Sequence, residues 1–265
     1  LRPEYTSPAM SRYIHDGWTT PVRWQFGGMV FEEADDVARQ QRSSIGAEAI
    51  GWPVGLADAE IVALAVAGLQ RAGVPDLVVH VGHVALLRAL LGRYVKDARM
   101  QRFLLNHVQT LRQPGGRDLV WGQITRLLRL DWQEAQAAVE SPSPAIVDAL
   151  LQPLERSQLM GGRSREDIQR RLLEKLERAE AISSLEQGLD ELERLIALEG
   201  PRRRVIPALR AHCASDSDAL RILDEWEAIL LMAEALGVDG SRIVLNPALS
   251  RNWDYYSGLV FELHS

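Results

Sequence analysis

The chain has 265 residues, of which 46% are hydrophobic and 25% charged, and its 30 basic and 36 acidic side chains give a net charge of −6 at neutral pH. This length and composition exclude a disordered or collagen-like chain, and they predict one large or two modest folded domains. Because the sequence contains no broad basic stretch and no apolar run of roughly 18 residues, we expect neither a nucleic-acid partner nor a membrane span.

The first third of the chain has the pattern of a mixed α/β region. Apolar runs at 23–26 and 29–31 are joined by Gly27 and Gly28. This arrangement predicts two short strands with a bulge or turn between them. A short β-branched run at 77–81 predicts a buried strand.

Helical periodicity dominates much of the remaining chain. Residues 57–72 repeat apolar side chains at helical spacing, and we predict a helix there with Asp58 as its N-cap and Gly73 as its C-cap. From about residue 84 to residue 237 the pattern is helical almost throughout. This long stretch predicts a helical block that follows the first strands.

Within the helical block, apolar positions repeat over 168–182 and again over 185–196. Ser183 and Glu186 are spaced as a capping box between the two runs. The spacing therefore predicts either two antiparallel helices or one kinked helix. Residues 216–236 carry a further apolar stripe, which predicts another helix.

Strand composition returns near the end of the sequence, at 242–245 and 257–263. Strands at both ends of the chain with helices between them favour an α+β fold. We expect a sheet-containing domain built from both ends of the chain, into which the helical block is inserted.

General catalytic and metal-binding motifs do not occur in the sequence. It has no glycine loop for phosphate, no dinucleotide-binding turn and no Gly-x-Ser-x-Gly elbow. His80 and His83 are three residues apart, but nothing nearby supplies the further ligands that zinc needs. We therefore predict no metal and no cofactor. The single cysteine, Cys213, excludes an internal disulfide and fits a cytoplasmic protein.

Polar side chains cluster at the ends of the predicted strands. They are Arg2, Glu4, Thr6, Glu48, Arg251, Asp254, Tyr255 and Tyr256. A strand-borne glutamate is costly to bury unless a cation meets it, so Glu4 and Glu48 either pair with arginines or face an amine-bearing ligand. For Tyr255 and Tyr256, the residues alone favour an aromatic pair at a strand edge that contributes to the core.

The same residues carry a resemblance to class II histidyl-tRNA synthetases. Residues 1–6, Leu-Arg-Pro-Glu-Tyr-Thr, are similar to the Leu-Arg-Pro-Glu-Gly-Thr motif of that family. Residues 251–262, Arg-Asn-Trp-Asp-Tyr-Tyr-Ser-Gly-Leu-Val-Phe-Glu, resemble its Arg-Gly-Leu-Asp-Tyr-Tyr-Thr-Gly-x-Val-Phe-Glu. Residues 28–31 and 45–51 are similar to the two strands of class II motif 2. Because the chain begins with Leu1 rather than methionine, we expect it to be trimmed at its front.

The resemblance implies a division of the chain and a fold. Residues 1–93 and 216–265 would form the synthetase-like, histidine-binding core, and 94–215 would form a helical insertion. The implied fold is the class II synthetase type, a mixed or antiparallel sheet flanked by helices. A cytoplasmic homodimer is the expected form within a larger assembly.

The matched residues form the histidine pocket in that family. By resemblance, the ammonium or imidazole of histidine would be bound by Glu4, Thr6 and Glu48. Arg251 would face the carboxylate or its activated phosphate ester. Tyr256 would line the imidazole side, with Tyr255 beside it in the same motif. This set suits a free amino acid, which needs anions for its ammonium and a guanidinium for its carboxylate.

Four substitutions separate this chain from a working synthetase. The arginine that grips the α-phosphate of ATP in the family is Glu32 here. At about 4 Å this reversal changes the Coulomb energy by roughly 2 kcal/mol in water and by about 8 kcal/mol at an effective dielectric constant near 20. Three further family residues are replaced by Tyr5, Ser44 and Asn252. We therefore predict that the chain has no aminoacylation activity and no catalytic residues.

A paralogous group fits both the resemblance and the departures. The run Val-Gly-His-Val-Ala-Leu-Leu-Arg-Ala-Leu at 81–90 resembles a segment of the regulatory subunits of short-form ATP phosphoribosyltransferase. Membership would imply assembly with a short catalytic subunit, which joins ATP to phosphoribosyl pyrophosphate in the first step of histidine biosynthesis, and feedback sensing of histidine. Two alternatives stay open, namely a histidyl-tRNA synthetase core and an interaction module with an empty pocket.

Overall fold

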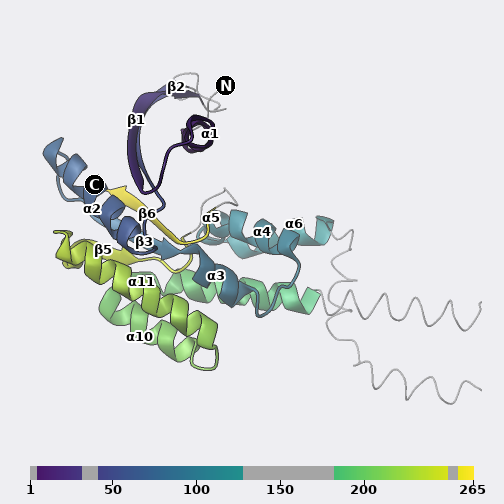
Figure 1. The fold of residues 1–265 in the computed structure, drawn as a ribbon. Helices are drawn as coiled ribbons and strands as arrows, with labels where there is room; N and C mark the ends of the chain where they lie inside the picture. The colour runs from purple at the N-terminus through teal and green to yellow at the C-terminus, as the bar shows by residue number, and fades with distance from the viewer. Residues whose placement is uncertain (1–4, 32–40, 128–181, 250–255) are drawn as a thin grey trace, which may run out of the picture. The chain divides into compact units, whose positions relative to one another are not determined.

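A computed structural model describes residues 5–31, 41–127, 182–249 and 256–265 of the chain. Up to residue 91 helices and strands alternate, as α1 (Thr6–Asp16), β1 (Val22–Phe31), β2 (Gln41–Ile50), α2 (Leu56–Arg71), β3 (Val78–His83) and α3 (Val84–Leu91) (Figure 1). Helices follow, as α4 (Ala98–Asn106), α5 (Val108–Leu111), α6 (Gly116–Leu127) and an α-helix over 182–197. The chain then continues through β4 (Gly200–Pro201), α10 (Arg202–His212), α11 (Ser217–Ala235), the 3-10 helix η3 (Gly240–Arg242), β5 (Ile243–Leu245) and β6 (Leu259–His264).

The strands form two sheets. The first is an antiparallel hairpin in which β1 pairs with β2, from Val22 opposite Ile50 to Phe31 opposite Gln41. The second has four strands in the order β4-β5-β3-β6, so it joins strands that lie before and after the helical middle of the chain. This combination confirms the predicted α+β fold class.

The β1 strand is unbroken, contrary to the prediction of two short strands joined by a bulge or turn. Its register runs regularly through Gly27, opposite Ile45, and Gly28, opposite Ser44. Gly28 has another role, because a methyl group added there would overlap the Tyr5 hydroxyl. A glycine inside a strand therefore marks a close approach here rather than a turn.

Two predicted helix ends also need correction. The α2 helix begins at Leu56, and the Asp58 carboxylate accepts a hydrogen bond of 2.9 Å from the Gly55 amide. Asp58 thus acts from the third position of a capping box rather than as the N-cap. Ser183 does not start a helix, because it lies inside the helix over 182–197, where its hydroxyl accepts from Gln187. The predicted C-cap region is correct, since Gly73 has a φ of 82° directly after the Ala72 cap.

The chain divides into two compact units. The first unit comprises Leu1–Val79, Leu223–Ile243 and Leu263–Ser265, and the second unit comprises His80–Ile222 and Val244–Glu262. Leucines fill the interior of the second unit, where the largest fully buried aliphatic side chains are Leu86, Leu87, Leu90, Leu91, Leu104, Ile124, Ile182, Leu189, Leu192, Leu195 and Leu209.

The units are not the predicted domains. Residues 80–93, 216–222 and 244–262 belong to the second unit, whereas the prediction includes them in the synthetase-like core. We keep the division into a core (1–93 and 216–265) and a helical insertion (94–215) as a proposal, because the resemblance on which it rests concerns evolutionary relation rather than compactness.

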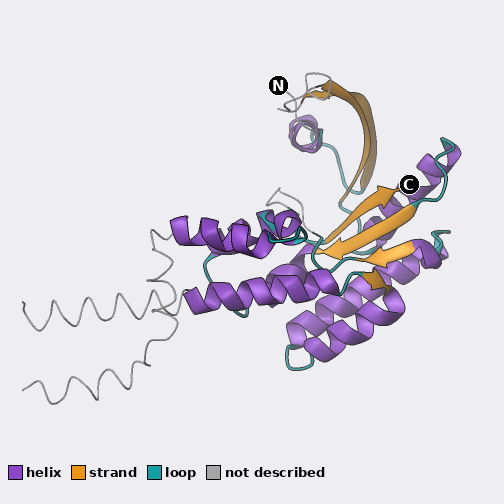
Figure 2. Cartoon of the chain, turned by 180° about the vertical axis from the view of Figure 1, so that it is seen from behind, coloured by secondary structure: helices purple, strands orange, loops and turns teal. Residues whose placement is uncertain are grey.

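Close packing and buried polar contacts join the helices of the second unit. Its α4–α6 helices and the helix over 182–197 run alongside each other (Figure 2), and a methyl group added at Gly188 would overlap the Val95 side chain. The Glu191 carboxylate, whose side chain is 0% exposed, contacts His212 Nε2 at 2.6 Å and Arg194 at 2.7 Å. Such contacts satisfy a carboxylate that would otherwise be costly to bury.

His80 also takes part in a polar contact of the second unit. Its Nδ1 lies 3.1 Å from the Glu199 carboxylate, to which Arg112 also donates at 2.6 Å. In the described ranges, no three His, Cys, Asp or Glu side chains cluster in a way that could hold a metal ion. None of the helices described has both the length and the apolar composition that crossing a membrane requires.

Candidate ligand-binding site on the β1–β2 hairpin

One face of the β1–β2 hairpin carries the candidate site. Along β1 the half-buried residues Trp24, Phe26 and Gly28 alternate with exposed ones, so these three share a face. The register sets Glu48 of β2 directly opposite Trp24, and directly opposed residues of antiparallel strands project to the same side. Helix α1 lies along this face, inside the curve of the hairpin (Figure 1).

Two predicted pocket residues meet at this face. The Thr6 hydroxyl donates a hydrogen bond of 2.8 Å to Glu48 Oε1, in a partly buried position. The sequence predicts Thr6 at the end of a strand, and this is wrong, because Thr6 is the first residue of helix α1. The helix therefore brings Thr6 to the hairpin face, and its hydroxyl orients the Glu48 carboxylate.

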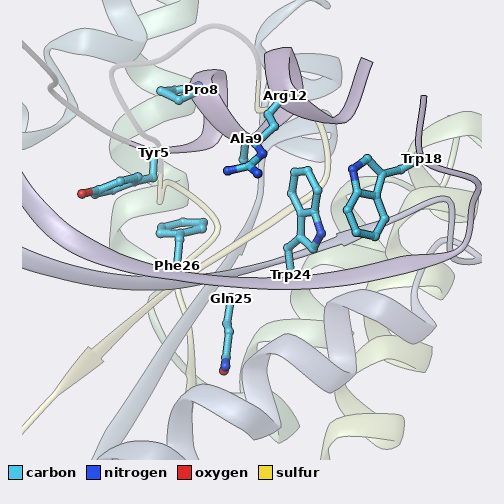
Figure 3. Close-up of a pocket in the computed structure, with 8 residues that line it drawn as sticks. All are labelled: Tyr5, Pro8, Ala9, Arg12, Trp18, Trp24, Gln25 and Phe26. Atoms are coloured by element: carbon cyan, nitrogen blue, oxygen red, sulfur yellow. The ribbon is translucent and has the colours of Figure 1, made fainter. Parts of the chain in front are cut away.

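A cavity of about 400 Å³ opens between α1 and the hairpin. Half of its lining residues are aromatic, and the lining, drawn in Figure 3, consists of Tyr5, Pro8, Ala9, Arg12, Trp18, Trp24, Gln25 and Phe26. Trp24 makes edge-to-face contacts with Trp18 and with Tyr13, at ring-centroid distances of 5.4 and 6.4 Å. These contacts hold the Trp24 ring in place beside the cavity.

Arg12 supplies a positive charge to the lining. Its side chain extends from α1 toward the space between Phe26 and Trp24 (Figure 3), and its Nε donates to Asp16 at 3.1 Å. Hydrogen bonds with His15 and Arg12 lower the pKa of Asp16 below its usual value. Asp16 and Arg12 thus form an ion pair beside the cavity.

The Tyr5 ring covers the hairpin next to this cavity. It stacks on Phe26 with a centroid distance of 5.0 Å and an interplanar angle of 23°. The Phe26 ring in turn lies over Gly46, where an added methyl group would overlap it. Tyr5, Phe26 and the glycine backbone thus form a stack on the site face.

The opposite face of the hairpin is held by a different set of contacts. Arg23 donates to both Glu60 carboxylate oxygens at 2.7 Å, and its guanidinium lies 3.7 Å from the Trp52 ring centroid. These contacts tie β1 to α2, and the pKa of Glu60 is lowered by its hydrogen bonds from Arg23. The contacts of the Arg23 face therefore stabilise the hairpin, and the candidate ligand site is on the Glu48 face.

The other predicted site residues lie outside the first unit or outside the described residues. Tyr256 belongs to the second unit, where it packs against a small core of Val84, Leu249 and Val260. This packing confirms the expectation that Tyr256 contributes to the core. Outside the described residues lie Glu4, Arg251 and Tyr255, together with Arg2, Glu32, Asn252 and Asp254.

The sequence reasoning missed the aromatic lining of the site. Trp24 and Phe26 are two residues apart in a strand, a spacing that would have placed both rings on the face of Glu48. Chemically, the face combines a carboxylate for a cation, a hydroxyl that orients it, a guanidinium for an anion and flat apolar walls. This combination suits a small zwitterion that carries a ring.

Comparison with known proteins supports the resemblance along the whole chain. A family model described as histidyl-tRNA synthetase matches residues 1–126 and 124–265. An ATP phosphoribosyltransferase regulatory subunit from Allorhizobium ampelinum is 30% identical over 285 residues, which cover 99% of this chain and 72% of that protein. A histidine–tRNA ligase from Methanospirillum hungatei JF-1 is 27% identical over 267 residues, which cover 99% of this chain and 47% of the ligase.

The fold has a solved counterpart. A structure of an ATP phosphoribosyltransferase regulatory subunit/histidyl-tRNA synthetase from Bacillus halodurans superposes with a TM-score of 0.61 and 20% identity. The match covers 100% of this chain and 53% of that one, so the chain spans about half the length of the solved relative. By the family model and the regulatory subunit that is 30% identical, the chain belongs to the histidyl-tRNA synthetase family and, within it, to the ATP phosphoribosyltransferase regulatory subunits.

Proposed function

We propose that this chain is a non-catalytic regulatory subunit of short-form ATP phosphoribosyltransferase, and that it binds histidine on the Glu48 face of the β1–β2 hairpin. The observation that carries this proposal is the 2.8 Å hydrogen bond between Thr6 and Glu48. Two residues far apart in the sequence, both assigned to histidine by resemblance, are in direct contact. Family membership supports the regulatory role.

The geometry suggests how histidine is held. The Glu48 carboxylate is half buried, so a cation that meets it there is attracted more strongly than it would be in water. The ammonium or the imidazole of histidine can supply that cation. The resemblance adds Glu4 to the cation side, Arg251 to the carboxylate, and Tyr255 and Tyr256 to the imidazole side.

Regulation requires that histidine distinguish two states of the assembly. A ligand with equal affinity for the active and inhibited forms shifts nothing, and a tenfold difference in affinity corresponds to about 1.4 kcal/mol. In this proposal the chain acts in the cytoplasm as a homodimer within a hetero-oligomer. The other component is the short catalytic subunit, which joins ATP to phosphoribosyl pyrophosphate. The chain itself contributes no catalytic residue.

The experiment is reconstitution of the full-length protein with a short-form catalytic subunit, followed by assay of the transferase at increasing histidine concentration. We expect the chain to activate the transferase, and histidine to inhibit the assembly. Glu48→Gln should raise the half-inhibitory histidine concentration about tenfold or more, because it removes the charge that meets the ligand cation. Activation without histidine should stay near the wild-type level.

Glu60→Gln is the matched control, because it makes the same chemical change in helix α2 of the first unit, at a residue that contacts Arg23 on the opposite face of the hairpin. It should leave histidine inhibition unchanged. Equal inhibition of the wild-type and Glu48→Gln assemblies would contradict the proposed site. Absence of activation by the wild-type chain would contradict the regulatory function.

A second function is a histidyl-tRNA synthetase core, which the likeness to the Methanospirillum ligase favours, over 99% of this chain and 47% of the ligase. It makes a different prediction, since a synthetase activates histidine with ATP and releases pyrophosphate. Histidine-dependent exchange of pyrophosphate into ATP measures that step directly. We expect no exchange above background, and robust turnover would exclude the non-catalytic assignment.

A further inference from the structure

We propose that Tyr5 is a specificity determinant of the hairpin face, because its ring fills the space that a planar ligand such as a purine base would need in order to stack on Phe26. This inference deepens the proposed function and rests on it. A histidine-sensing subunit needs a site for a small amino acid, whereas a synthetase also needs a site for a nucleotide.

Both faces of the Phe26 ring are occupied. One face lies against the backbone of β2 at Gly46, so closely that an added methyl group would overlap the ring. The other face is stacked by Tyr5, at 5.0 Å between ring centroids and 23° between planes. A flat ligand gains its stacking energy from an open aromatic face, and Phe26 has none to offer.

Tyr5 makes contacts through its backbone and through its hydroxyl group. Its backbone carbonyl accepts a hydrogen bond of 2.9 Å from the Ala9 amide in the first turn of α1. Its hydroxyl end lies over Gly28, where an added methyl group would overlap it, and is 3.5 Å from the Met29 carbonyl oxygen. Because Gly28 has no side chain, the Tyr5 ring can lie over β1 at this position.

The family motif differs from this chain at the position of Tyr5, and that difference decides whether the outer face of Phe26 is covered. The family motif that residues 1–6 resemble has glycine at the position of Tyr5. A glycine there would leave the outer face of Phe26 uncovered and would open a slot with the thickness of one ring beside the Arg12 cavity. Tyr5 closes that slot from within the chain, and the adjoining cavity of about 400 Å³ remains.

The test is binding of adenosine to the full-length protein, measured by calorimetry. Adenosine has the purine ring but no phosphate, so the charge of Glu32 does not affect the result through phosphate repulsion. We expect no heat of binding for the wild-type protein or for Tyr5→Phe, which keeps the ring. Tyr5→Gly should bind adenosine with a dissociation constant at least about tenfold below the wild-type limit, as stacking of one base on an aromatic ring allows.

Two further variants serve as a substitute and as a control. Tyr5→Ala opens the same slot with less backbone freedom, and it replaces Tyr5→Gly if circular dichroism shows that the glycine variant is unfolded. Tyr13→Ala removes a neighbouring α1 aromatic that contacts Trp24 rather than Phe26, and it should not bind adenosine. Failure of both folded slot-opening variants to bind adenosine, or binding by the wild type or Tyr5→Phe, would overturn the proposal.

A histidine titration of the same proteins separates this inference from the proposed function. Wild type and Tyr5→Phe should bind histidine alike. If the wild type binds no histidine, the proposed function fails whatever adenosine does. If the wild type binds histidine but removal of the Tyr5 ring does not admit adenosine, the role of Tyr5 alone is wrong.

Discussion

The β1 and β3 strands differ in how deeply their residues are buried. The lightly buried β1 carries the candidate site, whereas the deeply buried β3 belongs to the hydrophobic core. In β1 exposed and half-buried residues alternate and only Val30 is fully buried, whereas four of the six residues of β3 are buried. A two-stranded hairpin is marginal by itself. The hairpin is fastened by side chains such as Arg23 and Tyr5, and this arrangement leaves one of its faces to a ligand.

The two regions also differ in the residues that fill them. The interior of the second unit is packed mainly with leucine side chains, whose burial stabilises the fold by removing apolar surface from water. The site face uses tryptophan, tyrosine, phenylalanine, threonine and glutamate, whose rings and polar ends can contact a ligand. Changes in the second unit should therefore alter stability, and changes on the site face should alter binding.

The largest effect on stability is expected at Leu90, whose side chain is 0% exposed in the second unit. Leu90→Ala should lower the free energy of unfolding by about 2–5 kcal/mol, because it removes buried surface and leaves a cavity. Leu119 belongs to the same unit but is 57% exposed, and Leu119→Ala should cost less than about 0.5 kcal/mol. Urea titration followed by circular dichroism measures both. Similar losses in the two variants would contradict the assignment of the second unit's core.

A smaller effect is expected at Glu191, a buried charge in the same unit. Glu191→Gln should destabilise the protein by about 1–3 kcal/mol, since it leaves the His212 and Arg194 contacts without a full negative charge. Glu193→Gln is the control, because Glu193 lies two residues away on the same helix and is 40% exposed. It should lower the free energy of unfolding by less than about 1 kcal/mol. Equal costs would mean that burial does not set the strength of the Glu191 contacts.

Sequence reasoning found the helices more reliably than the details of the hairpin. The stripe over 216–236 predicted α11, in which Leu223, Trp226 and Leu230 are buried, because helical periodicity is a local signal that survives in the fold. The pair Gly27-Gly28 was taken as a break for the same local reason. At Gly28 the structure shows a different reason for glycine, namely the Tyr5 hydroxyl that lies over it, and Tyr5 lies more than twenty residues away in the sequence.

The candidate site shows the same limit. Thr6 and Glu48 were assigned by resemblance, and their hydrogen bond depends on a helix start meeting a strand more than forty residues later in the chain. The prediction of Ser183 as an N-cap is wrong, because residue 182 before it is already helical and the helix continues to 197. Local spacing alone does not distinguish a helix start from a helix interior.

The smallest effect is expected at Thr6, where the comparison between binding and stability is sharpest. Thr6→Val keeps the shape of the side chain but removes the hydroxyl that orients Glu48. The carboxylate and its charge remain, so histidine binding should weaken only about fivefold, which corresponds to roughly 1 kcal/mol for one lost hydrogen bond. Calorimetric titration with histidine gives the affinity, and urea titration should show a loss of no more than about 1 kcal/mol in the free energy of unfolding.

Thr6→Ser is the matched control for this prediction, because serine keeps the hydroxyl and loses only a methyl group. It should bind histidine with nearly wild-type affinity. If serine weakened binding as much as valine, shape rather than the hydrogen bond would position the ligand. If valine bound as tightly as the wild type, Glu48 would need no orientation by Thr6, and the contact would serve only to dock α1 on the hairpin. A loss of histidine affinity in Thr6→Val that Thr6→Ser does not share is what an orienting hydroxyl requires.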